Sequence, residues 1–280
     1  MHFSPSQYFY GANNTIQHAN VQMILSTLIP ALEYDESRKF TYVEQAFFSR
    51  WWNEQNDKMK DRVKKLVKSG QLSFVNGGWC MHDEAATHYY GMIDQTTLGH
   101  TFLKENFDFK PSVGWQIDPF GHSSTQASLL SAEAGFDALY FGRIDYQDLQ
   151  LRRDEQRVEG IWRASAASKD QSQVFWGLSG SYGGNYGPPE GFCFDNFCSD
   201  EPMMDDLDLE DYNVDGKVAD FVSAAYEQAN QARGTHIMMT MGSDFQYENS
   251  EVWFRNLDSV IKNVNEYAKE GKTEVDPYGR

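Results

Sequence analysis

Residues 113–123, VGWQIDPFGHS, join a short apolar run to a sharp turn that begins at a carboxylate. The run Val113–Ile117 predicts a buried strand, and Pro119 and Gly121 indicate that the chain turns directly after it. Asp118 is therefore expected at the carboxyl end of a strand. In α/β proteins this is the edge of the sheet where binding and catalytic residues gather.

Helical and strand patterns alternate on both sides of this stretch, which predicts an α/β fold. Mostly apolar strands separated by helices imply a parallel sheet covered by helices, either as a barrel or as an open doubly wound sheet. Pro30 should perturb the first helix, Gly70 should end the second, and residues 150–215 are expected to be irregular. The predicted helices are 16–33, 45–68, 94–106, 125–134, 217–232 and 251–268, and the strands are 40–44, 72–75, 113–117, 138–141 and 236–241.

The length of 280 residues suits one large domain, and the charge argues against some partners. With 41 acidic against 24 basic residues, the net charge of −17 disfavours nucleic acid and anionic membranes as partners. No apolar run approaches the length of a membrane span. Residues 1–10 lack the pattern of a secretory signal, so we expect either a cytosolic protein or a true N-terminus further upstream.

Carboxylates and aromatic residues recur where predicted strands end. Asp118 follows one strand, Asp244 follows the strand 236–241, and Arg143 and Tyr146 follow the strand 138–141. Paired carboxylates flanked by aromatic rings suit glycoside hydrolysis, in which one carboxylate attacks or stabilises the sugar and the other transfers a proton. Aspartates at strand ends are common in α/β proteins, so the pattern alone leaves this function open.

Three cysteines and seven histidines leave few options for metal chemistry. Cys193 and Cys198 fit neither a redox pair nor a zinc knuckle, and a local disulfide and two buried thiols both remain open. No His-x-x-x-His pair exists, which argues against a metal-dependent deacetylase. Asp118 with His122 would be a weak local metal site, because Pro119 and Gly121 interrupt any helix between them.

The loop that follows the strand 72–75 carries His82, Asp83, Glu84 and His88. These residues have the composition of metal ligands. Hydrogen bonds that hold a loop at the end of a strand are nevertheless the better explanation, because buried polar groups usually find partners within the protein.

Several blocks of sequence resemble the family 38 glycoside hydrolases, specifically the lysosomal-type α-mannosidases. The blocks are VEQAFFSRWW, VNGGWCMHDEAATHY, WQIDPFGHS, YFGRIDYQD and MTMGSDFQYEN, and the similarity runs from Gln7 to about Tyr267. The resemblance implies a (β/α)7-type barrel and a retaining α-mannosidase that removes terminal α-linked mannose from N-glycans and related oligosaccharides. Residues 1–280 would then be part of the N-terminal catalytic domain, with a loop insertion at 180–215.

The resemblance also implies roles for single residues. Asp118 matches the nucleophile, which is also a ligand of the catalytic zinc ion, and Asp244 matches the general acid/base. The residues that match substrate contacts are Phe120, Arg143, Tyr146 and Asp83. Cys193 and Cys198 match a short disulfide of lysosomal members, which implies a lysosomal or other acidic secretory compartment.

The sequence departs from the family at both ends. The six residues before Gln7 lack the His-x-Asp pair that binds zinc, and the chain stops at Arg280 before a further histidine ligand, so only Asp118 remains of four expected ligands. We therefore expect a longer natural protein. The alternative is a catalytically silent chain that at most binds glycans weakly. Because the missing segment includes a strand, we also expect the isolated chain to be marginally folded or prone to aggregation.

Overall fold

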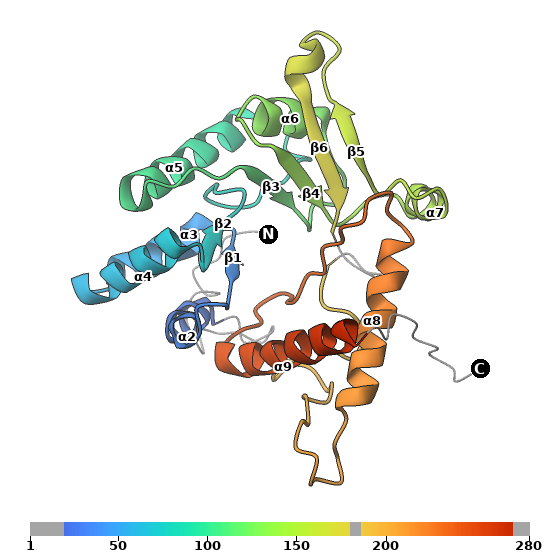
Figure 1. Cartoon of the computed structure of the whole chain (residues 1–280). Helices are drawn as coiled ribbons and strands as arrows, with labels where there is room; N and C mark the ends of the chain where they lie inside the picture. The colour runs from blue at the N-terminus through green and yellow to red at the C-terminus, as the bar shows by residue number, and fades with distance from the viewer. Residues whose placement is uncertain (1–19, 180–185, 271–280) are drawn as a thin grey trace.

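The computed structural model of the chain describes residues 20–179 and 186–270 and forms a mixed α/β fold (Figure 1). Within these ranges, no helix is both long and apolar enough to cross a lipid bilayer. The helices are α2 (Val21–Tyr34), α3 (Gln45–Glu54), α4 (Asp57–Ser69), α5 (Tyr90–Phe107), α6 (Ser124–Ala127), α7 (Tyr146–Asp154), α8 (Val214–Ala229) and α9 (Ser250–Lys269). The strands are β1 (Phe40–Tyr42), β2 (Leu72–Phe74), β3 (Val113–Gln116), β4 (Ala138–Phe141), β5 (Glu159–Arg163) and β6 (Gln173–Leu178).

The described strands form two sheets in which parallel pairing dominates. β1 pairs with β2, and the second sheet has the order β3-β4-β6-β5, in which only β5 is antiparallel to its neighbour. Asn76 connects the two sheets, because its amide donates to the carbonyl of Val113 at 2.7 Å and its side-chain Oδ1 accepts from the amide of Trp115 at 3.3 Å. The parallel α/β prediction is correct, but the described strands do not close into a seven-stranded barrel.

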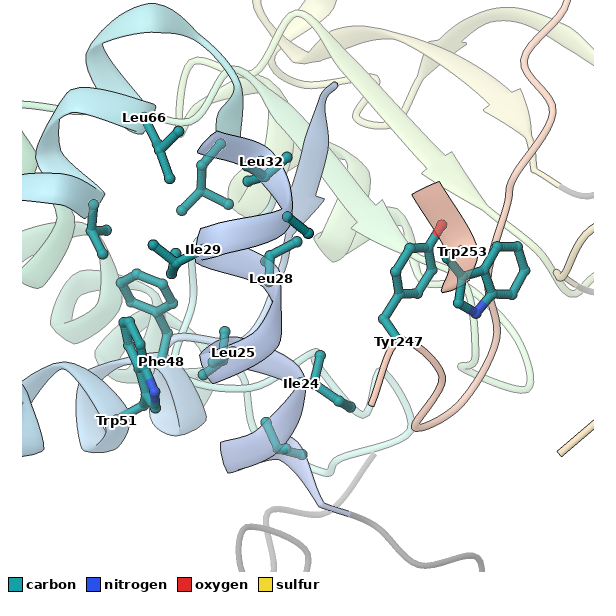
Figure 2. Packing of buried hydrophobic residues seen from close by; sticks show 14 of the residues in the cluster. Ile24, Leu25, Leu28, Ile29, Leu32, Phe48, Trp51, Leu66, Tyr247 and Trp253 are labelled. Atoms are coloured by element: carbon teal, nitrogen blue, oxygen red, sulfur yellow. The ribbon is translucent and has the colours of Figure 1, made fainter. Parts of the chain in front are cut away.

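The main hydrophobic core lies where α2 packs against α3, α4 and α9 (Figure 2). The apolar stripe of α2 faces inward as predicted, and its Pro30 is exposed without ending the helix. Trp51 and Trp52 on α3 are buried in the same cluster, as their helical spacing with Phe47 and Phe48 predicts. Burial of this stripe orients α2 against the three neighbouring helices.

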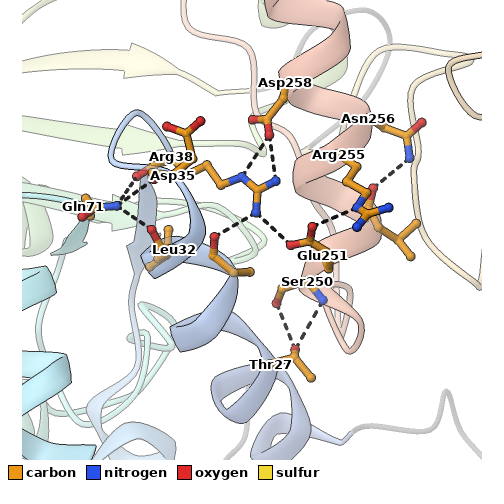
Figure 3. Close-up of polar contacts among 12 residues, drawn as sticks. Thr27, Leu32, Asp35, Arg38, Gln71, Ser250, Glu251, Arg255, Asn256 and Asp258 are labelled. Atoms are coloured by element: carbon orange, nitrogen blue, oxygen red, sulfur yellow. Dashed lines mark hydrogen bonds and ion pairs between the residues drawn. The ribbon is translucent and has the colours of Figure 1, made fainter. Parts of the chain in front are cut away.

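Arg38 connects the end of α2 to α9 through a buried ion-pair network (Figure 3). Its guanidinium donates to Glu251 at 2.8 Å, to Asp258 at 2.8 Å, and to the carbonyl of Ala31 at 2.8 Å. Because a buried guanidinium without partners would be very costly, these contacts hold α9 at a fixed position beside α2.

Three predicted elements are wrong. The helix predicted at 45–68 is two helices, because the chain is extended at Gln55 and the side chain of Asn56 caps α4 by accepting from the amide of Met59. The region 150–215 is not irregular throughout, since it contains the end of α7 and the antiparallel pair β5 and β6.

The third error concerns residues 236–241, which were predicted to form a buried apolar strand and do not form one. The carbonyl of Met238 accepts from the side chain of Gln228, and that of Met241 accepts from the hydroxyl of Tyr247. Side chains therefore satisfy backbone groups that a strand would pair in a ladder. Met238, Met239 and Met241 are half-buried rather than part of the core.

We expect Leu28→Ala to lower the free energy of unfolding by about 2–5 kcal/mol, because it opens a cavity at a fully buried position of α2. Met23→Ala on the same helix is the matched control, since Met23 is exposed, and it should change the free energy of unfolding by less than about 1 kcal/mol. Urea unfolding followed by circular dichroism measures both. Equal effects of the two changes would contradict the packing described here.

Candidate active site

The parallel register of β3 and β4 brings Asp118 and Arg143 together. Gln116 pairs with Phe141, and each of the two site residues lies two positions beyond its strand's last residue. The guanidinium of Arg143 donates to Oδ1 of Asp118 through Nη2 at 2.6 Å and Nε at 3.2 Å. Among the described residues, no group donates to the other carboxylate oxygen of Asp118, so that oxygen is available for chemistry.

Tyr186 links Asp118 to Asp244. Its hydroxyl lies 3.5 Å from Oδ1 of Asp118 and 3.1 Å from Oδ1 of Asp244. The two carboxylates, which lie far apart in the sequence, therefore flank one phenol oxygen. The sequence indicated convergence of the two aspartates but did not single out Tyr186, which lies at the end of a glycine-rich stretch that resembles an ordinary loop.

Two local features place Asp244 beside Tyr186. They are the backbone conformation of Gly242 and a hydrogen bond from Thr240 to the segment of Tyr186. Gly242 has a φ of +150°, and a Cβ there would approach the ring of Tyr247 to 3.0 Å, so glycine suits this position. The hydroxyl of Thr240 donates to the carbonyl of Gly187 at 2.8 Å. This contact places the segment that carries Tyr186 beside the segment that carries Asp244.

The surroundings of Asp244 favour its protonated form. Burial raises the pKa of the Asp244 carboxyl, the negative charge of Asp118 raises it further, and the Tyr186 hydrogen bond opposes both. Burial also raises the pKa of Glu44, which precedes α3 and interacts electrostatically with Asp244. Burial followed by the charges of Asp244 and Asp118 raises the pKa of the Tyr186 hydroxyl, so Tyr186 is neutral and can donate.

The residues that match substrate contacts in the family differ in how they relate to Asp118 and Asp244. Phe120 is 88% exposed, and the guanidinium of Arg143 lies 5.1 Å from the centre of its ring. Tyr146 is exposed at the first turn of α7, and Asp83 is exposed and accepts from the amide of Ala85 within its own loop. In the described ranges, neither Tyr146 nor Asp83 bonds to Asp118 or Asp244, so their roles stay predictions.

A disulfide joins Cys193 and Cys198, as the resemblance implies. Within the loop that it closes, Oδ2 of Asp195 accepts from the amide of Tyr247 at 2.9 Å and from Nε1 of Trp253 at 2.8 Å. The disulfide loop thus supports the segment that follows Asp244, and it anchors that segment to α9.

The buried histidine of the loop after β2 makes hydrogen bonds within the protein. His82 is buried, with Nδ1 2.7 Å from Oε1 of Gln126 and Nε2 2.9 Å from the hydroxyl of Thr96. Burial lowers the pKa of His82, which favours the neutral ring. The ring of His88 accepts from the amide of Tyr90 on the protein surface. The hydrogen-bonding role predicted for this loop is confirmed for His82.

The described residues do not make a zinc site by themselves. Across residues 20–179 and 186–270, no group of three or more His, Cys, Asp or Glu side chains could hold a metal ion. Asp118 is the one predicted ligand within these ranges. His122, which the sequence offers only as a weak local partner, has both ring nitrogens engaged, by Glu84 and by the carbonyl of Arg143. Catalytic zinc normally takes about three protein ligands, so a single carboxylate is insufficient.

Comparison with known proteins identifies the family. The N-terminal domain of glycosyl hydrolases family 38 matches residues 6–277, and the chain belongs to this family. It is 54% identical over 260 residues to a probable alpha-mannosidase of Arabidopsis thaliana, covering 92% of this chain and 25% of that protein. It is 48% identical over 269 residues to the human lysosomal alpha-mannosidase, covering 95% of this chain and 26% of that protein.

A solved structure supports the fold. An alpha-mannosidase from Enterococcus faecalis superposes with a TM-score of 0.58 at 16% identity, covering 92% of this chain and 27% of that one. At this identity the likeness concerns the fold alone. The chain spans about a quarter of the length of the curated relatives described above.

We expect Tyr186→Phe to raise the pKa of Asp244. The hydroxyl donates to Oδ1 of Asp244 and stabilises the ionised carboxylate, so its removal favours the protonated form. Titration of the Asp244 carboxyl carbon by 13C NMR measures the change. Tyr146→Phe is the control, because Tyr146 is exposed and should leave this pKa unchanged. A lower or unaltered pKa in Tyr186→Phe would show that the hydrogen bond does not act on Asp244.

Replacing both disulfide cysteines, Cys193→Ser with Cys198→Ser, should lower the free energy of unfolding by about 2 kcal/mol, the loop-closure entropy expected for so short a loop. Urea unfolding of the oxidised protein is the measurement. Cys80→Ser removes a thiol outside the disulfide and serves as the control. A double variant as stable as the parent would mean that the disulfide does not support this part of the fold.

Proposed function

We propose that this chain supplies the reacting residues of a retaining α-mannosidase that removes terminal α-linked mannose from N-glycans and other mannose-containing oligosaccharides. The observation that carries the proposal is the convergence of Asp118 and Asp244 on the hydroxyl of Tyr186. The names of the relatives, which are alpha-mannosidases of plants and mammals, support the choice of sugar.

The closeness of the two carboxylates favours retention over inversion. The Tyr186 oxygen lies 3.5 Å from one carboxylate oxygen and 3.1 Å from the other, so these two oxygens cannot be farther apart than the sum of the two distances. Carboxyl groups are separated by about 5–5.5 Å in retaining enzymes and by about 6.5–9.5 Å in inverting ones. The sum only just reaches the inverting range, which leaves little room for the water molecule that an inverting enzyme holds between its catalytic base and the sugar.

In the proposed first step, the free oxygen of Asp118 attacks the anomeric carbon of mannose. As the bond between that carbon and the glycosidic oxygen breaks, Asp244 gives its proton to the departing oxygen. In the second step Asp244, now a carboxylate, takes a proton from water. The water oxygen bonds to the anomeric carbon as the ester bond to Asp118 breaks, which releases mannose and restores both side chains.

The surroundings of each carboxylate suit its proposed role. Burial and the neighbouring charge raise the pKa of Asp244, which helps it to hold a proton for the leaving group. The guanidinium of Arg143 donates to Oδ1 of Asp118 at 2.6 Å, which orients the carboxylate while its second oxygen faces the substrate side of the proposed reaction. The exposed ring of Phe120 offers an apolar surface on which the apolar face of a sugar can stack.

Three further parts of the proposal rest on the resemblance. One is a complete (β/α)7-type barrel. Another is a zinc ion bound to Asp118 together with ligands from outside the described residues; when bound, the ion would coordinate sugar hydroxyls, and no step above depends on it. The third is a lysosomal or other acidic secretory location, which agrees with the disulfide and with relatives named lysosomal alpha-mannosidases.

Asp118→Asn should lower the rate of hydrolysis of an aryl α-mannoside by more than about a thousandfold, because the nucleophile is lost. Asp61→Asn on the exposed face of α4 is the control and should retain full activity. NMR of the first product should show the α-anomer. Near-normal turnover by Asp118→Asn would overturn the assignment. Binding of mannosides by the parent chain without any turnover would support the silent glycan binder instead.

A further inference from the structure

Glu84 is a buried carboxylate beside the candidate nucleophile, and none of the steps above uses it. Its side chain is 2% exposed. It accepts three hydrogen bonds, from Nε2 of Gln116 at 3.0 Å, from Nδ1 of His122 at 2.9 Å and from the amide of Ser123 at 2.7 Å. Gln116 ends β3 and Ser123 ends the turn that contains Asp118, so Glu84 holds both ends of that turn.

His122 connects Glu84 to the segment that follows β4. Its Nε2 lies 2.9 Å from the carbonyl oxygen of Arg143, and its ring packs on Phe141 with the ring centres 4.4 Å apart. The side chain is only 7% exposed. Each ring nitrogen of His122 thus faces an oxygen atom, one from the Glu84 carboxylate and one from the Arg143 carbonyl, and the ring connects the two segments.

Arg143 is the residue that this arrangement constrains. Its carbonyl is held by His122, and its guanidinium donates to Oδ1 of Asp118. Arg143 lies in the segment between β4 and α7. The ion pair is partly exposed, with 42% of the Arg143 side chain and 21% of the Asp118 side chain accessible. A pair this exposed contributes little by itself, so a fixed backbone is needed to hold the guanidinium in place.

We propose that Glu84 and His122 form a positioning pair for the nucleophile. Glu84 fixes the turn that carries Asp118, and His122 fixes the backbone of Arg143, so that the guanidinium meets one oxygen of Asp118 and leaves the other free to attack. The expected effect of this pair on catalysis rests on the proposed function. The positioning itself is a property of the folded protein and can be measured without turnover.

The kinetic test separates a positioning role from a purely structural one. His122→Phe keeps a ring against Phe141 but removes both hydrogen bonds, and it should lower kcat about 10- to 100-fold while KM changes less than about threefold. In an Arg143→Ala background the same change should have little further effect, because His122 acts through Arg143. An equal loss in both backgrounds, or no loss in either, would overturn the proposal. His236→Phe, at an exposed histidine, is the control.

A second readout does not depend on hydrolysis. In NMR of the 15N-labelled protein, the Nε–H signal of Arg143 should be shifted and protected from exchange by its bond to Asp118. This protection should persist in His236→Phe and disappear in His122→Phe. Glu84→Gln, which keeps the size of the side chain and removes its charge, should also abolish it, and this variant replaces His122→Phe if the latter does not fold.

Retained Arg143 protection in a folded His122→Phe or Glu84→Gln protein would refute the positioning pair whether or not the protein hydrolyses mannosides. Loss of protection in a protein without hydrolase activity would support the pair while the proposed function fails. The two failures are therefore distinguishable.

Discussion

The parallel ladder between β3 and β4 is the constraint on which the candidate site depends. Its register pairs Gln116 with Phe141, so the chain leaves both strands at the same level of the sheet. Two residues further on in each case, Asp118 and Arg143 meet as an ion pair. A shift of one strand by one residue would turn every side chain of that strand to the opposite face. The hydrophobic packing that fixes the register therefore also fixes the charge pair.

The other half of the site lies outside regular secondary structure. Tyr186 and Asp244 belong to segments that are held by single contacts, such as the bond from Thr240 to the carbonyl of Gly187. The disulfide loop and α9 support these segments, and the buried Arg38 ties α9 to α2. Stability and the properties of the candidate site are thus linked, because the pKa of Asp244 is raised by burial that distant parts of the chain provide.

Much of the architecture follows from local pattern. The stripe of α2, the cap at Gly70 and the strand–turn around Asp118 have strong local signals, and the structure contains all three. The elements that differ from the prediction do so for different reasons. β5 is short, carries charged residues at both ends, and gains its order mainly by pairing with β6. Residues 236–241 are as apolar as a strand, but side chains from elsewhere satisfy their carbonyls. Strand propensity depends on the local sequence, so it does not reveal side-chain donors that come from other parts of the fold.

Residue type and short-range spacing are enough to indicate the family, the helix stripes and the two candidate carboxylates. The position of Tyr186 between Asp118 and Asp244, and the contacts of Glu84 with His122 and of His122 with Arg143, become visible only in the folded chain. These contacts join residues that are distant along the chain, and their formation depends on how strands and loops pack. Burial, and with it the pKa of Asp244, exists only once that packing is complete.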